Sequence, residues 1–283
     1  MCRLYGFHAS APSQVECTLV RAQNALLAQS RTDQRGVANA DGWGIGFYGN
    51  GTPEIEKCDT AAFQDLRFSE AAQQVHSPTV IAHVRRATVG TSQRANTHPF
   101  SFGVWTFAHN GTVTAFDRVA PELERQTEPR LLEHLQGSTD SELVFLWLLG
   151  RLADAGLDPE GPCRDLGRLV EVFASSVGAL VALSRRLGAT EPTKLNLLLT
   201  DGVVLVASRR GNTLYCVERQ GVHDCQVCGS PHLASEGDAD YRAAIVASEP
   251  ISREAWREVP EGSLVSIDGD IGLEIVPLGG EGR

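Results

Sequence analysis

The sequence places a cysteine directly after the initiator methionine, as Met1-Cys2. Cysteine is small enough for methionine to be removed ahead of it, and the mature chain would then begin at Cys2. Such a residue carries both a thiol and an α-amine whose pKa lies close to neutral, so the sulfur can act as a nucleophile and the amine as its base. The alternative is that a cysteine at this position is accidental. Other residues must decide between the two interpretations.

Polar residues that could assist such a nucleophile stand where predicted strands end. The Asn110-Gly111 pair in FAHNG is either a hairpin turn or an oxyanion hole, in which the Asn side-chain NH₂ and the Gly backbone N–H are the donors. In IAHVRRATVG, alternation puts His83 and Arg85 on one face of a strand. A guanidinium at a strand end is either solvated or binds a substrate carboxylate with two hydrogen bonds.

Asp140 in GSTDSE opens a predicted apolar helix. A carboxylate there interacts favourably with the helix dipole, or it could pair with the ammonium group of an amino-acid substrate. A thiol with its own amine, an oxyanion hole and the Arg85/Asp140 pair together describe one chemistry, which is cleavage of the side-chain amide of glutamine or of a γ-glutamyl compound. The glycine-rich DGWGIGFY is no dinucleotide-binding fingerprint, because the helix and the third glycine are missing.

Six motifs occur in a characteristic order: MCRLYGF, DGWGIGFY, AHVRRATVG, NTHPF, FAHNG and TDSE. In this order the chain resembles the class II glutamine amidotransferases. The likeness continues through KLNLLLTDG and IVASEPISREAWREVPEGSLV, so it covers nearly the whole chain. It is strongest to short stand-alone members, such as the γ-glutamyl amidohydrolase of ergothioneine biosynthesis and the amidotransferase-like subunit of the fungal glutathione-degrading complex. The resemblance implies the N-terminal-nucleophile hydrolase fold, an α+β sandwich of four layers (αββα) with two antiparallel sheets between helix layers.

The resemblance also implies roles for individual residues. It makes Cys2 the nucleophile, its α-amine the base, and Asn110 and Gly111 the oxyanion hole. The residues implied to bind the substrate are Arg85 for the α-carboxylate, Asp140 for the α-ammonium, and Thr88 and His98 as the lining of the γ-glutamyl pocket. No metal and no cofactor belong to this catalytic site.

The implied reaction is hydrolysis of a γ-glutamyl amide through a thioester on Cys2, with release of glutamate. Arg86 and Val89 stand where the large synthase members have a tryptophan and a histidine, so this motif does not imply an ammonia-using partner domain. Two alternatives remain open. One is a glutaminase subunit that delivers ammonia to a separate synthase, and the other is a non-catalytic scaffold subunit. The sequence does not identify the leaving amine. A synthase or peptidase partner protein and a homo-oligomer also stay open.

A second group of cysteines and histidines lies in CVERQGVHDCQVCGSPH. Its members are Cys216, His223, Cys225, Cys228 and His232. The Cys-x-x-Cys pair with nearby histidines could bind zinc, form a redox pair or consist of ordinary thiols. Because the family's catalysis requires no metal, a metal here would be structural or would shape a substrate-binding loop.

The composition excludes several classes of protein. Lys and Arg number 25 against 35 Asp and Glu, and the net charge is −10, which disfavours nucleic acid and anionic membrane surfaces as partners. The N-terminus has no signal-peptide pattern, and no run reaches the roughly 18 apolar residues that a membrane span needs. Seven scattered cysteines favour reduced thiols and therefore a cytoplasmic location.

The predicted elements come in groups, which favours antiparallel sheets covered by helices over a doubly wound parallel fold. Asp201-Gly202 between two apolar runs predicts a hairpin. We expect a single domain over residues 2–283, with 220–242 as a loop. Predicted strands are 43–48, 79–89, 103–109, 195–210 (containing the hairpin), 213–219, 243–250 and 262–268, and predicted helices are 14–29, 60–75, 138–153 and 164–184.

Overall fold

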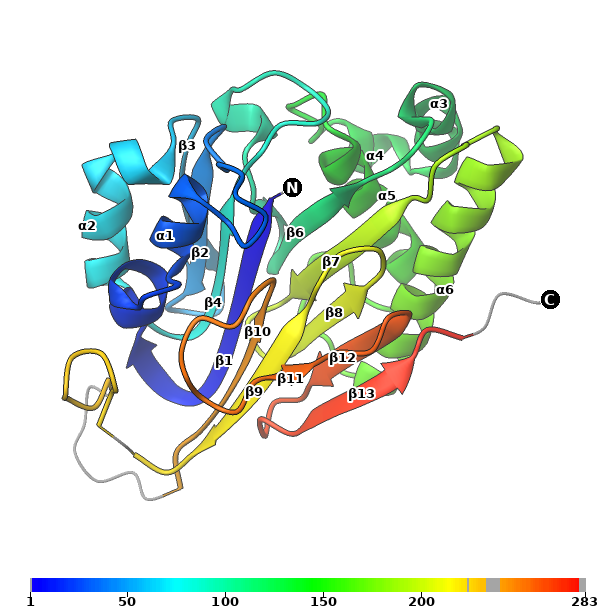
Figure 1. Ribbon diagram of the computed structural model, residues 1–283. Helices are drawn as coiled ribbons and strands as arrows, with labels where there is room; N and C mark the ends of the chain where they lie inside the picture. The colour runs from blue at the N-terminus through cyan, green and yellow to red at the C-terminus, as the bar shows by residue number, and fades with distance from the viewer. Residues whose placement is uncertain (1, 223, 233–239, 280–283) are drawn as a thin grey trace.

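Two antiparallel sheets pack face to face between layers of helices (Figure 1). The computed structural model describes residues 2–222, 224–232 and 240–279. The first sheet, sheet A, has seven strands in the order β11-β9-β10-β1-β4-β2-β3. Its strands are β1 (Arg3–Gln14), β2 (Trp43–Tyr48), β3 (Pro53–Cys58), β4 (His76–Val84), β9 (Tyr215–Gln220), β10 (Arg242–Ala247) and β11 (Arg257–Glu258).

The second sheet, sheet B, has six strands in the order β13-β12-β8-β7-β6-β5. Its strands are β5 (Phe100–Phe102), β6 (Trp105–Thr112), β7 (Lys194–Thr200), β8 (Leu205–Arg209), β12 (Ser263–Ile267) and β13 (Leu273–Pro277). The predicted hairpin at Asp201-Gly202 is confirmed, since these residues connect β7 to β8. Gly202 has a φ of +90°, a conformation that glycine adopts without strain.

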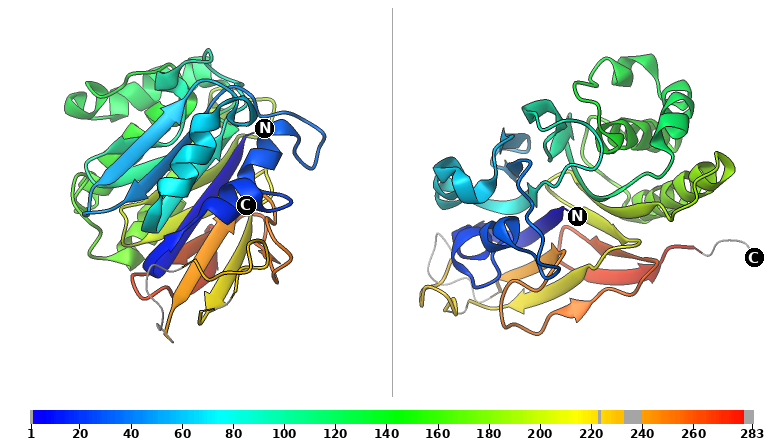
Figure 2. Two further views of the ribbon diagram at one scale, coloured as in Figure 1. Left: turned by 90° about the vertical axis from the view of Figure 1, so that its left-hand side faces the viewer. Right: turned by 45° about the horizontal axis from the view of Figure 1, so that its top comes forward.

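The helices cover the outer face of each sheet, on opposite sides of the molecule (Figure 2). Sheet A carries α1 (Leu26–Arg31) and α2 (Leu66–Gln74), and sheet B carries α3 (Phe116–Gln126), α4 (Pro129–Leu132), α5 (Asp140–Asp154) and α6 (Leu166–Arg186). Single turns also form at Cys17–Arg21 (π-helix), Ala62–Gln64 and Arg94–Asn96 (both 3₁₀).

Alternation along the strands explains the layers, because successive side chains point to opposite faces of a sheet. Phe7 and Val80 point outward from sheet A into the core shared with α1 and α2. Leu4 and Ile81 point inward, where they meet Ala108 and other side chains from sheet B. The outer face of sheet B packs on α3, α5 and α6. The expected four-layer αββα arrangement is therefore present.

The two long predicted helices are confirmed as α5 and α6. The side chain of Thr139 caps α5 by accepting a hydrogen bond from the Glu142 N–H at 3.2 Å. Among the described residues, α6 alone is long and apolar enough to cross a membrane, with a mean hydropathy of 1.7. Its buried side chains belong to the core shared with α5 and sheet B, which gives this apolar face a place inside the fold.

Three predicted elements are wrong. The helix predicted at 60–75 is divided into the Ala62–Gln64 turn and α2, because Asp65 between them is extended. Residues 14–29 do not form one helix, because β1 extends to Gln14 and an extended residue, Ala22, separates the Cys17–Arg21 turn from α1. The strand predicted at 79–89 ends at Val84, since the chain then folds around the Arg85 side chain. The long central strand β1 was not predicted, and neither were elements that are short or mostly polar, such as β3 and α3.

Candidate active site

Cys2 directly precedes β1, the strand that occupies the centre of sheet A. Its side chain is 8% exposed. The sulfur accepts a hydrogen bond from the Arg86 N–H at 3.2 Å, and the thiol donates to the Arg86 carbonyl oxygen at 3.3 Å. Burial raises the pKa of Cys2, although the hydrogen bond from Arg86 and the positive charge of Arg85 oppose this rise. At neutral pH the group is therefore a thiol, and a base must remove its proton before it can attack.

A buried ion network fixes the backbone of Cys2. Arg3 donates from Nη1 to the Cys2 carbonyl oxygen at 2.9 Å. The same guanidinium pairs with Glu249 and Asp33, each at 2.7 Å. All three side chains are at least nine-tenths buried, so the interactions are little screened by water. Sequence reasoning missed this network because its members come from three separate segments.

Arg85 follows β4 directly and is 2% exposed. Its Nη1 donates to the Thr91 carbonyl oxygen at 3.0 Å and its Nη2 to the Val89 carbonyl oxygen at 2.9 Å. Among the ion pairs found within the described residues, none involves Arg85. Burial lowers its pKa, while the nearby Cys2, Asp41 and Asp140 oppose that change. The structure thus holds a buried guanidinium near the thiol without a bound carboxylate.

Asn110 lies in β6 on the face of sheet B that is turned toward sheet A, like Ala108 two residues before it. Its side chain is 1% exposed. The amide nitrogen donates to Ser248 Oγ at 3.1 Å, and the amide oxygen accepts from Asn212 Nδ2 at 3.3 Å. Ser248 Oγ also accepts from the Leu4 N–H at 3.0 Å. Ser248 therefore links Asn110 to the strand that begins at Cys2.

The hairpin-turn interpretation of Asn110-Gly111 is wrong. Both residues are inside β6, where they pair with Asn196 and Leu195 of β7. A Cβ atom on Gly111 would collide with the Lys194 carbonyl oxygen, so the strand needs glycine at this point. The assignment of these two residues to an oxyanion hole remains a prediction.

Asp140 is the first residue of α5 and is 3% exposed. One carboxylate oxygen accepts the Val113 N–H at 2.7 Å, just after the end of β6. The other accepts the Ser141 hydroxyl at 3.1 Å, and Ser141 is also hydrogen-bonded to His109 at 2.9 Å. The charge of Asp140 influences the pKa of both Cys2 and Arg85, so the structure places it within electrostatic range of both groups.

Thr88 and His98 occupy different surroundings. Thr88 is exposed, and its hydroxyl lies 3.0 Å from that of Thr112, next to Gly111. His98 is buried, with its ring centroid 4.2 Å from that of His83, and neither ring nitrogen has a partner among the described residues. Burial and the neighbouring positive charges hold the pKa of His98 well below its usual value, so the ring is neutral. Their assignment to the γ-glutamyl pocket also stays a prediction.

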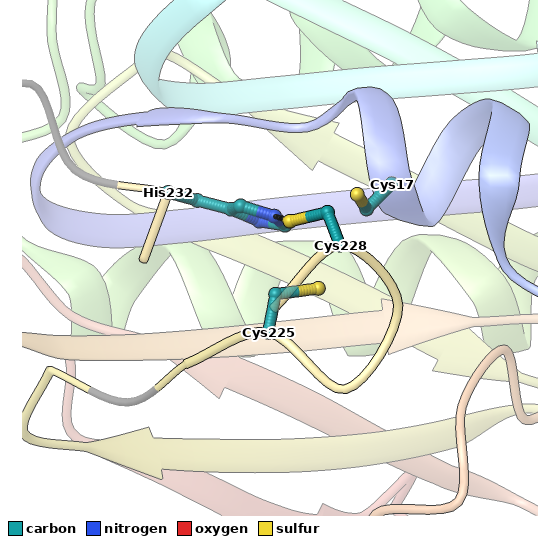
Figure 3. Close-up of side chains that lie close together, drawn as sticks. All are labelled: Cys17, Cys225, Cys228 and His232. Carbon is teal, nitrogen blue, oxygen red and sulfur yellow. Dashed lines mark hydrogen bonds between the residues drawn. The ribbon is translucent and has the colours of Figure 1, made fainter. Parts of the chain in front are cut away.

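The second cysteine group differs from what the sequence suggested. Cys225, Cys228 and His232 come together with Cys17, which sequence reasoning missed because it lies far away in the chain (Figure 3). Cys216 points into the core between the sheets instead. His223 lies outside the described residues.

A cavity of about 550 Å³ adjoins this second group. Its lining includes Cys17, Cys225 and His232, but none of the residues predicted to be catalytic or substrate-binding. Cys17 follows the end of β1 opposite to Cys2, so a role of the segment in shaping the substrate site is not supported.

The family described as class II glutamine amidotransferases matches residues 1–276. The probable glutamine amidotransferase DUG3 of Saccharomyces cerevisiae is 30% identical, over 94% of this chain and 82% of its own. The γ-glutamyl-hercynylcysteine sulfoxide hydrolase of Mycobacterium tuberculosis is 28% identical, over 94% and 93%. The solved structure of a glutamine aminotransferase class-II domain protein from Silicibacter pomeroyi matches with a TM-score of 0.63 at 21% sequence identity. The match covers 99% of this chain and 100% of that one, so the two proteins share the fold.

Proposed function

Because the chain belongs to the class II glutamine amidotransferases, an enzyme family that cleaves C–N amide bonds, we propose that it hydrolyses a γ-glutamyl amide through a thioester on Cys2. The observation that carries this proposal is Arg85, a buried guanidinium near a buried thiol, with no carboxylate bound among the described residues. Burying such a charge is costly unless an anion completes the site. A substrate α-carboxylate would be that anion.

The substrate is oriented by its two α-substituents. Arg85 donates hydrogen bonds to the α-carboxylate, and the Asp140 carboxylate accepts hydrogen bonds from the α-ammonium. Both groups are already held by backbone contacts, so little ordering is needed when the substrate binds. The γ-carbonyl would then face Cys2. A substrate must carry both a free α-carboxylate and a free α-ammonium to satisfy both partners, as a γ-glutamyl compound does.

Attack requires the thiol proton to move. With Met1 removed, the free α-amine of Cys2 accepts this proton, and the sulfur attacks the γ-carbonyl carbon. The Asn110 side chain and the Gly111 N–H would donate to the resulting oxyanion, an effect worth roughly 3–4 kcal/mol per donor. The α-ammonium then protonates the leaving amine as the C–N bond breaks. Water, activated by the same amine, hydrolyses the thioester and releases glutamate.

The identity of the leaving amine defines the substrate. We favour a γ-glutamyl conjugate of a small metabolite, since one relative is named as a hydrolase of γ-glutamyl-hercynylcysteine sulfoxide. Free glutamine is the second candidate, since another relative is named a probable glutamine amidotransferase.

The test measures glutamate release by the purified protein over glutamine and a panel of γ-glutamyl amides. The matched variants are Cys2→Ala and Cys163→Ala, the second being a half-buried cysteine outside the site. Intact mass reports whether Met1 is removed. Rapid turnover of one conjugate that depends on Cys2 supports the proposal. Turnover of glutamine alone indicates a synthase partner, whereas no turnover with an intact Met1 indicates a scaffold subunit.

A further inference from the structure

Four side chains that the reaction does not use converge beyond the far end of β1 (Figure 3). Cys17 comes from the π-helical turn that follows β1, and Cys225, Cys228 and His232 come from the segment after β9. Their sulfur and ring-nitrogen atoms all lie within 4.8 Å of one another. Cys228 Sγ and His232 Nε2 are 3.2 Å apart.

These distances fit a tetrahedral metal ion. Zinc binds thiolate sulfur at about 2.3 Å and imidazole nitrogen at about 2.0–2.1 Å, which separates the ligand atoms of one tetrahedron by roughly 3.5–3.8 Å. The four atoms already lie close to that spacing, so small side-chain rotations are sufficient. Three sulfurs and one nitrogen select zinc over magnesium or calcium, which require oxygen ligands.

The backbone of the segment places its two cysteines on the same side of a tight turn. Cys225 accepts the Gly229 N–H at its carbonyl oxygen, at 2.8 Å, and donates its own N–H to the Ser230 carbonyl oxygen at 3.1 Å. The Val227 N–H donates to the Cys225 sulfur at 3.4 Å. A hydrogen bond of this kind stabilises the negative charge of a thiolate ligand.

The cluster also joins two distant parts of the chain. The Gln14 N–H donates to the His232 carbonyl oxygen at 2.9 Å, which fixes the fourth side chain beside the end of β1. The segment has little hydrophobic anchoring of its own, since Val227 is 42% exposed. A link through four side chains would add an anchor that this polar segment does not obtain from hydrophobic packing. The adjoining cavity gives an ion a route to Cys17, which is itself buried.

We propose that Cys17, Cys225, Cys228 and His232 bind one zinc ion, which fastens the segment after β9 to the turn after β1. The three thiols each lose a proton to solvent when zinc binds, and the neutral imidazole contributes its nitrogen without a proton change. Protein side chains occupy all four coordination positions of the ion, so neither water nor a substrate can bind to it. A zinc ion of this kind is structural. Its place is also remote from the reaction, because the 12 residues of β1 separate the Cys17 turn from Cys2.

The first experiment measures the metal content of the full-length protein by inductively coupled plasma mass spectrometry. We expect about one zinc per chain in the wild type and in the control Cys163→Ser, and a loss of most of it in Cys225→Ser and Cys228→Ser. Cys2→Ala keeps its zinc, so this result does not depend on the proposed reaction. Zinc retained at the wild-type level in both Cys225→Ser and Cys228→Ser would overturn the proposal, as would iron or copper in its place.

A second experiment needs no variant and therefore does not depend on whether the variants fold. Wild-type protein, freed of metal by a chelator under reducing conditions, is titrated with cobalt(II). We expect the absorption of a tetrahedral cobalt–thiolate centre at one cobalt per chain, displaced by zinc. The absence of this absorption contradicts the proposal. A Cys225–Cys228 disulfide in protein purified under reducing conditions also contradicts the proposal, because a disulfide cannot provide two thiolate ligands. Such a disulfide lowers the intact mass by two hydrogens.

Discussion

Cys2 and Cys17 stand at opposite ends of the same strand, and their surroundings differ in almost every respect. Among the described residues, Cys2 is hydrogen-bonded to the backbone of Arg86, and the charges of Arg85 and Asp140 act on it. Cys17 faces two further cysteines and a histidine. In Figure 1 the N-terminus lies at one end of β1, and the segment after β9 extends beyond the other end.

The difference shows how neighbours decide what a thiol does. A single thiol close to hydrogen-bond donors and a buried guanidinium can be consumed and regenerated in a reaction. Several thiols within reach of one point fill the coordination of a metal ion and leave none of them free to react. One end of β1 is therefore expected to serve the reaction and the other end to serve stability.

The largest expected effect comes from replacing Cys2, the proposed nucleophile. Cys2→Ala should lower kcat by at least about a thousandfold, because the amide has no other nucleophile to form the acyl intermediate. Its melting temperature and zinc content should match those of Cys163→Ala. Glutamate release by Cys2→Ala at an appreciable fraction of the wild-type rate would remove the basis for the division.

The second-largest loss of activity is expected at Asn110, the proposed oxyanion donor. Asn110→Ala is expected to lower kcat by about a hundredfold to a thousandfold, with a smaller change in KM, because the lost hydrogen bond forms mainly in the transition state. Steady-state kinetics on the best substrate measures this split. Ser248→Ala offers a graded comparison, since it removes only the hydroxyl that holds the Asn110 amide. An unchanged kcat in Asn110→Ala would exclude this residue from the oxyanion hole.

Arg85 should affect binding rather than the chemical step. Arg85→Met is expected to reduce kcat/KM by about a hundredfold or more, chiefly through KM, because removing one partner of a buried charge pair costs about 3–5 kcal/mol. Arg164→Met, which replaces an exposed arginine, is the control. If Arg85→Met binds γ-glutamyl substrates as tightly as the control does, the α-carboxylate is held elsewhere.

At the other end of the strand the expected effect is on stability. Cys228→Ser should lower Tm by roughly 5 °C or more, since the energy of metal binding is lost from the folded state. The kcat of the folded protein should stay within about twofold of the wild type because the cluster is remote from Cys2. If Cys228→Ser has the Tm of the wild type but a much lower kcat, the cluster serves the reaction and not stability, which contradicts this assignment.

The smallest predicted effect concerns the buried histidines near the catalytic end. Burial lowers the pKa of His83 to about 3, from an ordinary value of 6.5. Between pH 6.5 and 3 the unfolded chain therefore binds a proton that the folded chain does not, and the free energy of unfolding falls as the pH falls. His83 contributes at most about 1.4 kcal/mol per pH unit to this loss.

Urea unfolding at pH 7 and pH 5 measures the effect as a difference between variants. His83→Gln should lose less stability than the wild type over this interval, while His76→Gln, which replaces an exposed histidine, should behave like the wild type. Equal losses in all three proteins would mean that His83 is protonated in the folded state.

At the end of β1 that carries Cys2, the sequence signals are local, and the structure brings the charges of Arg85 and Asp140 within electrostatic range of the thiol, while the roles of these residues stay predictions. The helix that begins at Asp140 was predictable because it has a capping residue and a continuous apolar run. Strand alternation did not extend to Arg85, because β4 ends at Val84. The Arg3–Asp33–Glu249 network and the contact from Ser248 to Asn110 were not predictable, since they join segments whose separation is set by the packing of the whole fold. The same reason hid Cys17 from the Cys-x-x-Cys motif. Asn110-Gly111 misleads in the opposite way, because a favoured turn sequence is used inside a strand.

The most direct test of the central claim is to trap the acyl intermediate. The wild-type protein is mixed with its best γ-glutamyl substrate, quenched in acid within the first turnover, and measured by intact and peptide mass spectrometry. The account predicts a gain of one glutamyl group on the peptide that begins with Cys2, lost on treatment with hydroxylamine and absent from Cys2→Ala. A glutamyl group on any other cysteine, or on a chain that still carries Met1, would contradict it.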